Sequence, residues 1–242
     1  MSTDQHSAAP RFWAVIPAAG IGSRMGTAGP KQYLPLRGMT VLEHTLARIV
    51  ANPRIAATVV VIAATDRDWP RIAAGLAGQA LIVAEGGAER CHSVLNGLRA
   101  LAGHAAPRDW VLVHDAARPC VRRGDIDHLM EQLREHPHGG LLGLPVTDTM
   151  KRSDAHGNVI ETVGREGLWR ALTPQMFPYE MLTHALQAAL DRDMTVTDEA
   201  SAMEMAGYVP RMVEGHADNI KITRPQDLAL AEMYIQQQQE QA

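Results

Sequence analysis

A glycine-rich stretch with two positive side chains follows an apolar run near the start of the chain. The run at 14–16 is typical of a buried strand, and the residues after it are small. Small residues let backbone N–H groups approach a ligand closely, and Arg24 and Lys31 add positive charge. The pattern therefore predicts a loop that binds phosphate groups. Its small residues are Ala18, Ala19, Gly20 and Gly22, preceded by Pro17.

This loop matches neither common phosphate-binding motif. In the dinucleotide motif G-x-G-x-x-G, Gly20 and Gly22 would be the first two glycines, but Met25 takes the third place. The motif G-x-x-x-x-G-K-[ST] requires a glycine directly before the lysine, and Lys31 has none. An oxidoreductase that binds a nicotinamide dinucleotide is thus disfavoured, and an ordinary strand-to-helix turn stays an alternative.

Other polar side chains that could share this site are spread along the chain, and positive ones outnumber acidic ones. The sequence has no H-E-x-x-H motif, no Ser-His-acid set at recognisable spacing and no clustered His and Cys ligands. His114 is expected to be structural because no nucleophile adjoins it, and Cys91 to be a small packed residue. The candidate set is Arg24, Lys31, Ser93, Asp115, Arg118, Thr149, Arg165, Thr173, Thr197, Asp218 and Lys221.

A site rich in cations and poor in bases suits phosphoryl or nucleotidyl transfer. Catalysis of these reactions consists mostly of positioning and of charge stabilisation. If the nucleophile is itself a phosphate, it is largely ionised at neutral pH, because its second pKa is about 6. No general base is then required.

Strands and helices alternate over the first part of the chain, which predicts a parallel sheet covered on both faces. Ligands of such sheets bind outside the carboxyl ends of the strands. Unusual polar or glycine-rich loops follow three of these ends, at 18–31, 85–93 and 115–119, so they are expected to surround one crevice. The expected strands are 58–63, 80–84, 110–114 and 140–144, and the expected helices are 41–50, capped by Thr40, 69–76, 93–101 and 126–133.

The alternation stops after Pro145. Two extended runs, 149–152 and 159–163, flank a turn at 154–157 and predict a hairpin, either a surface excursion or an arm that pairs with a second copy. Helices at 178–190 and 197–206, strands at 209–214 and 219–223, and a last helix with Pro225 as its first residue are expected after it.

The composition bounds the class of protein. The 242 residues predict one domain over 11–238, with 146–172 as an extended β-arm and flexible tails at 1–10 and 239–242. A net charge of −4 gives no reason to expect a nucleic-acid partner. No run has the length of a membrane span. Two widely separated cysteines, Cys91 and Cys120, suggest a reducing compartment, and a cytoplasmic location is expected.

Several motifs together resemble the polyol-phosphate cytidylyltransferase family, within the nucleotidyltransferases that activate sugar and polyol phosphates. The resemblance covers nearly the whole chain, with the motifs in the family's order. They are 17–24 with 30–33, 86–94, 113–119, 145–151, 172–175, 197–201 and 218–228. The resemblance implies a Rossmann-like α/β fold with a mostly parallel sheet. It also implies transfer of CMP from CTP to a polyol phosphate, here 2-C-methyl-D-erythritol 4-phosphate, with ribitol 5-phosphate as the alternative.

The resemblance also implies roles for individual residues. Arg24 and Lys31 match the pair that stabilises the pentavalent transition state, and Arg165 and Lys221 match the pair that positions the nucleophile; Arg170 competes with Arg165 for this assignment. The implied CTP site is Pro17, Ala18, Ala19, Gly20, Gly22, Gly86, Gly87, Ser93, Asp115 and Ala116. The implied polyol-phosphate site is Asp115, Arg118, Thr149, Arg165, Thr173, Thr197, Asp218 and Lys221.

The same resemblance implies a homodimer and a metal ion. The hairpin would reach across the dimer, so that Thr149 and Arg165 act in the neighbour's site. Mg²⁺ would be held mainly by the CTP phosphates, and no protein metal ligand is assigned. A nucleotide-sensing module without turnover is a further alternative, which Arg24, Lys31 and Lys221 disfavour because a pure binder needs no transition-state cations.

Overall fold

The computed structural model describes residues 9–20 and 29–241 and is built on one seven-stranded sheet. The strand order is β11-β7-β10-β6-β1-β4-β5. Neighbouring strands are parallel except β10, which is antiparallel to both β6 and β7, so the sheet is mostly parallel, as predicted. The strands are β1 (Phe12–Pro17), β4 (Ile55–Ile62), β5 (Leu81–Glu85), β6 (Trp110–Val113), β7 (Gly140–Pro145), β10 (Trp169–Pro178) and β11 (Arg211–Glu214).

The central strands are apolar along their length because both faces of the sheet are covered. In β1, Ala14 and Ile16 belong to the core on one face, while Trp13 and Val15 belong to the core on the other. This division follows the two-residue period of a strand. A continuous apolar run, rather than an alternating one, is therefore the pattern of these strands.

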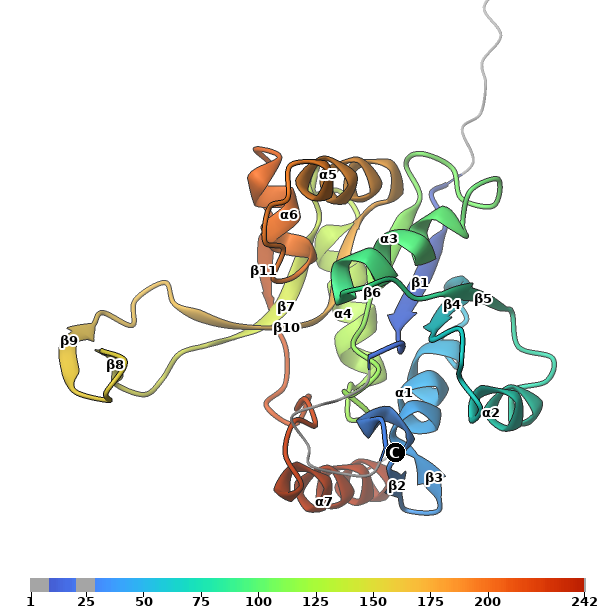
Figure 1. Ribbon diagram of the computed structural model, residues 1–242, viewed down its shortest axis with the longest axis horizontal. Helices are drawn as coiled ribbons and strands as arrows, with labels where there is room; N and C mark the ends of the chain where they lie inside the picture. Colours follow the sequence, from blue (N-terminus) through green and yellow to red (C-terminus); the bar gives the residue numbers. More distant parts are fainter. Residues whose placement is uncertain (1–8, 21–28, 242) are drawn as a thin grey trace, which may run out of the picture.

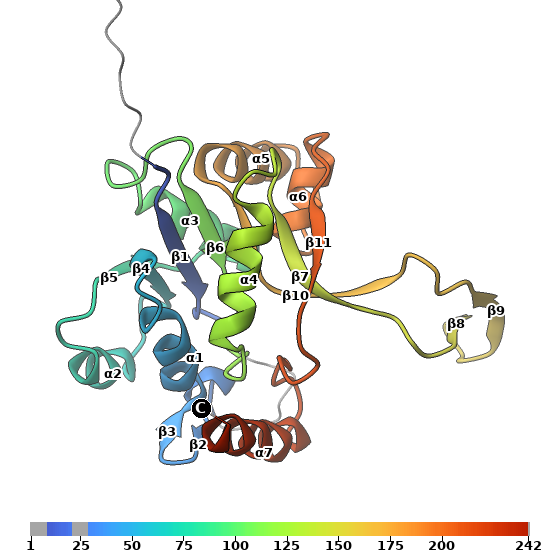
Figure 2. The same ribbon diagram turned by 180° about the vertical axis from the view of Figure 1, so that it is seen from behind.

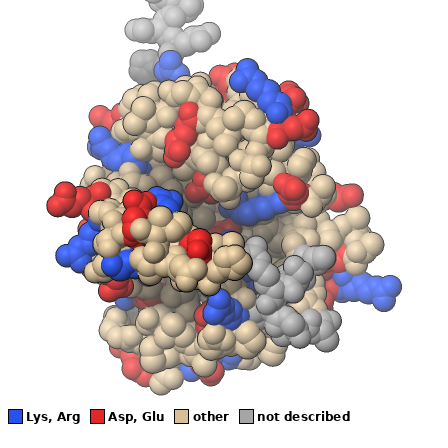
Figure 3. Space-filling view, turned by 60° about the vertical axis from the view of Figure 1, so that its left-hand side comes forward, with Lys and Arg blue, Asp and Glu red and all other residues tan. Residues whose placement is uncertain are grey.

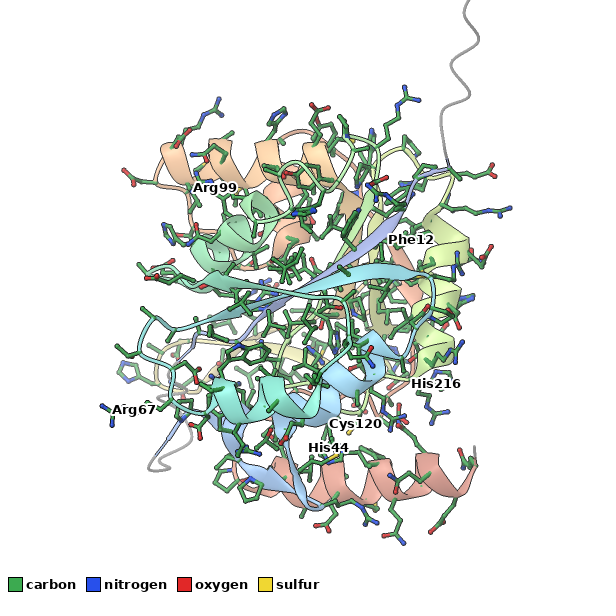
Figure 4. The ribbon with its side chains drawn as sticks, turned by 90° about the vertical axis from the view of Figure 1, so that its right-hand side faces the viewer. Phe12, His44, Arg67, Arg99, Cys120 and His216 are labelled. Atoms are coloured by element: carbon green, nitrogen blue, oxygen red, sulfur yellow. The ribbon has the colours of Figure 1, made fainter. Side chains whose placement is uncertain are left out.

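Helices cover the two faces of the sheet (Figures 1 and 2). One face is covered by α1 (Val41–Val50), α2 (Trp69–Gly75) and α4 (Arg123–Leu133), and the other by α3 (Arg90–Arg99), α5 (Tyr179–Asp191) and α6 (Glu199–Met205). Thr40 caps α1 as predicted, and its hydroxyl accepts from the Glu43 N–H while Glu43 accepts from the Thr40 N–H. In Figure 4, Arg99 projects from α3 toward α5, where its Nη2 donates to Gln187.

The last helix, α7 (Gln226–Glu240), packs against a third, smaller core that includes Leu36, Val41 and Cys120. Leu36 belongs to a short hairpin of β2 (Pro35–Leu36) and β3 (Met39–Thr40), which follows a 3₁₀ turn at Lys31–Tyr33. This packing draws the C-terminal segment back toward the start of the chain. α7 runs to Glu240, two residues past the predicted end of the domain.

Strand β10 was not expected from the sequence. It contains Pro174 and polar side chains such as Thr173 and Gln175, which interrupt the apolar pattern of a central strand. The sheet accommodates Thr173 and Pro174 because the pairing with β7 shifts between Ala171 and Gln175, which leaves both residues outside that ladder. Gln175 stays in the ladder, opposite Leu141.

Two expectations near the C-terminus were wrong. Residues 219–223 form no strand, because their backbone bonds to the loop after β6, where the Ile222 N–H donates to Ala117. Pro225 lies just before α7 as its N-cap and is not the first helical residue.

The predicted hairpin is present and projects from the body of the molecule (Figures 1 and 2). It consists of β8 (Met150–Ser153) and β9 (Val159–Val163), an antiparallel pair separate from the main sheet. The two strands carry a cross-strand ion pair, with 2.6 Å between Arg152 Nε and Glu161 Oε1. In Figure 3, where the hairpin comes to the front, charges of both signs are visible on it.

Candidate functional site

The loops that follow β1, β5 and β6 meet around one cavity of about 630 Å³ at the carboxyl ends of these strands. Residues from far downstream, Lys221 and Thr223, complete the wall. Of the residues predicted to bind or act, those that line the cavity are Pro17, Ala18, Ala19, Gly20, Lys31, Gly87, Ser93, Asp115, Ala116 and Lys221. The convergence expected from the strand order is therefore present in the fold.

The remaining predicted residues do not line this cavity. Arg118 and Thr173 lie directly behind Asp115, and Gly86 packs against Ala19. Thr149 and Arg165 are exposed on the projecting segment, and Thr197 is exposed just before α6. Asp218 is buried elsewhere and accepts from Arg122 and Gln238. Gly22 and Arg24 lie outside the described residues.

The loop after β1 is held by Gln32, a residue to which the sequence assigned no role. Its Nε2 donates to the Ala18 carbonyl at 2.6 Å and to the Gly20 carbonyl at 3.0 Å. Gln32 itself lines the cavity, so these bonds fix the backbone of the loop at the cavity wall. Lys31 lies next to Gln32 and donates from Nζ to the Ile222 carbonyl at 2.8 Å, which brings it close to the Lys221 segment.

The loop after β5 depends on two close approaches that only glycine allows. A Cβ on Gly86 would lie 2.2 Å from the Ala19 Cβ, and one on Gly87 would lie 2.4 Å from the His92 Cβ. The Ser93 hydroxyl accepts from the Gly87 N–H at 3.1 Å and donates to the Glu89 carbonyl at the same distance. Ser93 therefore fixes the loop that forms this side of the cavity.

Asp115 is the centre of charge in the site. Its Oδ1 lies 3.1 Å from Arg90 Nε, and its Oδ2 lies 2.9 Å from Lys221 Nζ and 3.3 Å from Arg118 Nε. Burial alone would raise the pKa of this carboxyl, but the charges of Arg90, Lys221 and Arg118 outweigh burial and hold the pKa far below its usual range. Asp115 is therefore ionised at any pH at which the protein works, and it holds three cations in place.

Arg90 and Glu199 form a second ion pair that sequence reasoning missed. The guanidinium donates twice to the fully buried Glu199 carboxylate, at 2.6 and 3.0 Å. Burial opposes the charge on Arg90, but Glu199 and Asp115 more than offset this and raise its pKa. Both residues belong to motifs that were recognised, 86–94 and 197–201. They lie 109 positions apart in the sequence, so no local pattern indicated the pairing.

A buried hydrogen-bond network behind Asp115 sets its position. The Asp115 N–H donates to Thr173 Oγ1 at 3.1 Å, and this hydroxyl lies 2.8 Å from His114 Nδ1. His114 Nε2 lies 3.1 Å from the Arg118 carbonyl, which can only accept, so Nε2 carries the proton and Nδ1 accepts from Thr173. Burial lowers the pKa of His114 to about 4, which keeps the ring neutral. The structural role expected for this histidine agrees with its contacts.

A mostly parallel sheet, a loop of small residues after its first strand and a cation-lined cavity at its carboxyl edge together define an enzyme of the nucleotidyltransferase class. Comparison with known proteins gives the particular family. Residues 12–237 match the family described as 2-C-methyl-D-erythritol 4-phosphate cytidylyltransferase, and the chain belongs to it. Membership excludes the dinucleotide-dependent oxidoreductase that the loop motif had already disfavoured.

Curated relatives and solved structures agree with this assignment. The chain is 56% identical over 229 residues to the 2-C-methyl-D-erythritol 4-phosphate cytidylyltransferase of Aeromonas hydrophila, covering 95% of this chain and 91% of the relative. It is 54% identical to that of Pseudomonas aeruginosa, covering 90% and 94%. A crystal structure of 4-diphosphocytidyl-2C-methyl-D-erythritol synthase superposes with a TM-score of 0.82 at 38% identity, covering 95% and 100%. The enzyme of Francisella tularensis superposes with a TM-score of 0.77 at 35% identity, covering 93% and 99%.

Within the described residues, no helix is both long enough and apolar enough to cross a membrane.

Proposed function

We propose that this protein transfers CMP from CTP to 2-C-methyl-D-erythritol 4-phosphate, giving CDP-methylerythritol and pyrophosphate for isoprenoid precursor synthesis. A phosphate oxygen of the polyol phosphate attacks the α-phosphorus of CTP, and the bond from that phosphorus to the β-phosphate oxygen breaks. The single observation that carries this proposal is the cavity lined by Lys31, Arg90 and Lys221, the last two paired with Asp115, in a chain of this family.

The cavity supports this reaction by position and by charge. Lys31 and Lys221 line it from two segments 190 positions apart, so an anionic group bound between them would meet positive charge on both sides. Preorganised charges of this kind stabilise the negative charge that develops on a phosphoryl group in the transition state. No general base is needed, since the attacking phosphate is largely ionised at neutral pH. Arg24 is the proposed partner of Lys31 in stabilising the pentavalent transition state.

The small-residue loop and the glycine turn are the proposed CTP site. Ala18, Ala19 and Gly20 present backbone on one wall, and Gly87 presents it on another. Backbone groups can read the edge of a base with few side chains, which agrees with the small residues here.

Mg²⁺ would offset the charge of the triphosphate. Both Asp115 oxygens already contact cations, so the phosphates of CTP, and not this carboxylate, are its proposed main ligands.

The projecting segment is the proposed dimer arm. Residues 11–238 would form one domain, with 146–172 as the arm. Thr149 and Arg165 are exposed on it, and Arg165 Nη1 donates to the Thr147 carbonyl, so nothing in their own protomer brings them to the cavity. An arm that crosses a two-fold axis would deliver both residues to the partner's cavity.

The two free, buried cysteines agree with a reducing compartment, and a cytoplasmic location stays a prediction.

The substrate is tested by pyrophosphate release. The purified enzyme is given CTP and Mg²⁺ with either 2-C-methyl-D-erythritol 4-phosphate or ribitol 5-phosphate, and kcat/KM is measured for each. We expect a strong preference for methylerythritol phosphate. A preference for ribitol 5-phosphate would overturn the substrate assignment, and CTP binding without product from either would favour a nucleotide-sensing module.

The arm is tested by mixing inactive protomers. Arg24→Ala disables the cavity, and Arg165→Ala disables the arm. In a heterodimer of the two variants, one cavity has both a wild-type loop and a wild-type arm, and the other has neither. Activity averaged over the two sites should therefore return toward half of the wild-type value. Verified heterodimers without regained activity would place both residues in the same protomer's site.

A further inference from the structure

Three side chains of different metal-binding types meet at the start of α3. They are Glu89, Cys91 and His92, and their ligand atoms all lie within 4.8 Å of one another. Cys91 Sγ lies 3.8 Å from Glu89 Oε2 and 3.7 Å from His92 Nδ1. Among the described residues, no other three His, Cys, Asp or Glu side chains meet in this way.

These separations are those of a tetrahedral zinc site. With Zn–S bonds of about 2.3 Å and Zn–N or Zn–O bonds of about 2.1 Å, the sulfur of such a site lies about 3.6 Å from its nitrogen and oxygen neighbours. The observed 3.7 and 3.8 Å differ from this value by no more than about 0.2 Å, and the Glu89 and His92 ligand atoms lie within 4.8 Å of each other. Cys91 therefore already lies at ligand spacing from both neighbours, and the exposed Glu89 side chain can move to complete the site.

Among the described residues, no ion pair or capping hydrogen bond engages the side chains of the three donors, and Cys91 also packs in the core under α3. Glu89 is the N-cap residue of α3, but its side chain makes no capping hydrogen bond, and it is exposed. Cys91 is a free thiol, and His92 is half-buried beside it. The neighbouring cation Arg90 is already paired with Glu199 and Asp115, so it does not compete for Glu89 in the structure.

We propose that Glu89, Cys91 and His92 bind one thiophilic divalent cation of the Zn²⁺ class, with a fourth position open to water. Binding transfers the thiol proton of Cys91 to solvent and leaves the thiolate, the imidazole and the carboxylate as ligands. This ion is separate from the Mg²⁺ that would accompany CTP, because Mg²⁺ prefers oxygen ligands in octahedral geometry and sulfur selects softer metals. Cys91 is packed in the core, as expected, and the proposal gives this buried thiol a ligand role as well.

The proposed ion would lie at the edge of the nucleotide cavity. Glu89 lines that cavity, and His92 packs so closely on Gly87 that a Cβ there would lie 2.4 Å from the His92 Cβ. A bound ion would fix both side chains and, through them, the Gly87 turn. The site is nevertheless independent of the proposed reaction, because its donors do not require a nucleotide.

The experiment is equilibrium dialysis of the full chain, free of nucleotide and Mg²⁺, against Zn²⁺. The wild-type protein should hold one equivalent that Cys91→Ala and His92→Ala lose. Cys120→Ala is the matched control, since Cys120 lies against α7 (Figure 4) and its thiol donates to the Ala231 carbonyl. It should keep the equivalent. Co²⁺ in place of Zn²⁺ should give a near-ultraviolet thiolate-to-metal absorption band in wild type and Cys120→Ala, and not in Cys91→Ala.

Further variants separate this site from other places where a cation could bind. Asp115→Asn and His136→Ala should both keep the Zn²⁺ equivalent, because neither the charge cluster nor the half-buried His136 supplies a ligand. Thermal unfolding without metal shows whether each variant is folded. Where Cys91→Ala or His92→Ala is not folded, His92→Asn is measured in its place. Absence of a Zn²⁺ equivalent in the wild type, or its retention in both folded Cys91 and His92 variants, would overturn the proposal.

Discussion

Individual charged residues organise the site around one carboxylate. Asp115 contacts three cations from three segments of the chain, Arg90, Arg118 and Lys221. Two of these, Arg90 and Lys221, also line the cavity. A buried charge network of this kind is costly unless every member is paired, so the loss of one member should disturb the others. The position of positive charge around the cavity is thus a property of the network and not of each residue alone.

Lys31→Ala should lower kcat by about two to three orders of magnitude. Removing one preorganised charge contact to a transition state costs roughly 3–4 kcal/mol, and Lys31 lines the cavity. Steady-state pyrophosphate release at saturating substrates measures the effect. Arg67→Ala is the charge-matched control, because Arg67 is exposed and points away from the body (Figure 4). Turnover of Lys31→Ala close to that of the control would remove Lys31 from the mechanism.

His114 should make the folded state less stable in mild acid. Its pKa is about 4 in the folded protein, because of burial, and about 6.5 in the unfolded chain. The unfolded chain therefore binds the extra proton as the pH falls from about 6.5 to about 4, and stability is lost over that window. The share lost between pH 7 and pH 5 is about 2 kcal/mol.

Urea unfolding at pH 7 and pH 5 measures this loss, with His114→Gln as the comparison. The variant has no titrating ring, so its stability should fall by about 2 kcal/mol less than that of the wild type over the same interval. An equal fall in both proteins would mean that other groups carry the acid sensitivity.

At the scale of elements, the antiparallel strand β10 joins the two halves of the sheet. It lies between β6 and β7, and its Thr173 and Gln175 reach elements on either side, the loop after β6 and the start of α6. The Gln175 carbonyl oxygen Oε1 accepts from the Ala200 N–H at 2.8 Å, which ties α6 and its Glu199 to the sheet. The strand that sequence patterns missed is therefore the one that connects the ion pairs of the site.

Gly140→Ala should destabilise the edge of this sheet. A Cβ at Gly140 in β7 would lie 2.1 Å from the Arg211 carbonyl oxygen of β11, and backbone cannot move aside as a flexible side chain can. We expect the free energy of unfolding to fall by about 1–3 kcal/mol, as in other overpacked sites. Urea denaturation measures the change.

Gly124→Ala in α4 is the matched control. A Cβ there meets nothing within 4 Å, and alanine favours a helix over glycine by up to about 1 kcal/mol. This variant should be as stable as the wild type or more so. A Gly140→Ala protein as stable as Gly124→Ala would show that β7 and β11 can separate without cost.

At the scale of the whole molecule, the arm leaves apolar side chains without cover in one protomer. Val159 and Ile160 are 63% and 62% exposed in β9. A two-stranded hairpin is marginal in water by itself, and burial against a second copy would stabilise it. The same contact would carry Thr149 and Arg165 across the dimer, so assembly and activity should depend on each other.

The double substitution Val159→Lys with Ile160→Lys should shift the proposed dimer to monomer in sedimentation velocity. Two charges in an apolar interface would remove its hydrophobic gain and add repulsion. Val83→Lys is the control, since Val83 is 50% exposed on the edge strand β5, away from the arm. It should leave the dimer intact. A double variant that sediments like the wild type would exclude β9 from the interface.

The sequence by itself determined the features that depend on local order along the chain. Apolar runs predicted the parallel strands, Thr40 before an apolar helical pattern marked the start of α1, and the small-residue loop with Lys31 predicted a phosphate site at the end of the first strand. These properties arise from the period of a strand or helix and from the space that a side chain needs, so neighbouring residues suffice to show them.

Only the tertiary structure decided which distant residues meet. The pairing of Arg90 with Glu199, the three cations on Asp115, and the place of β10 between β6 and β7 join segments far apart in sequence. No local pattern encodes such contacts, because hydrogen bonds and ion pairs between distant segments form only after the sheet has brought the segments together. Glu89, Cys91 and His92 are the reverse case: they are near neighbours in sequence, and the start of α3 brings their ligand atoms within 4.8 Å of one another.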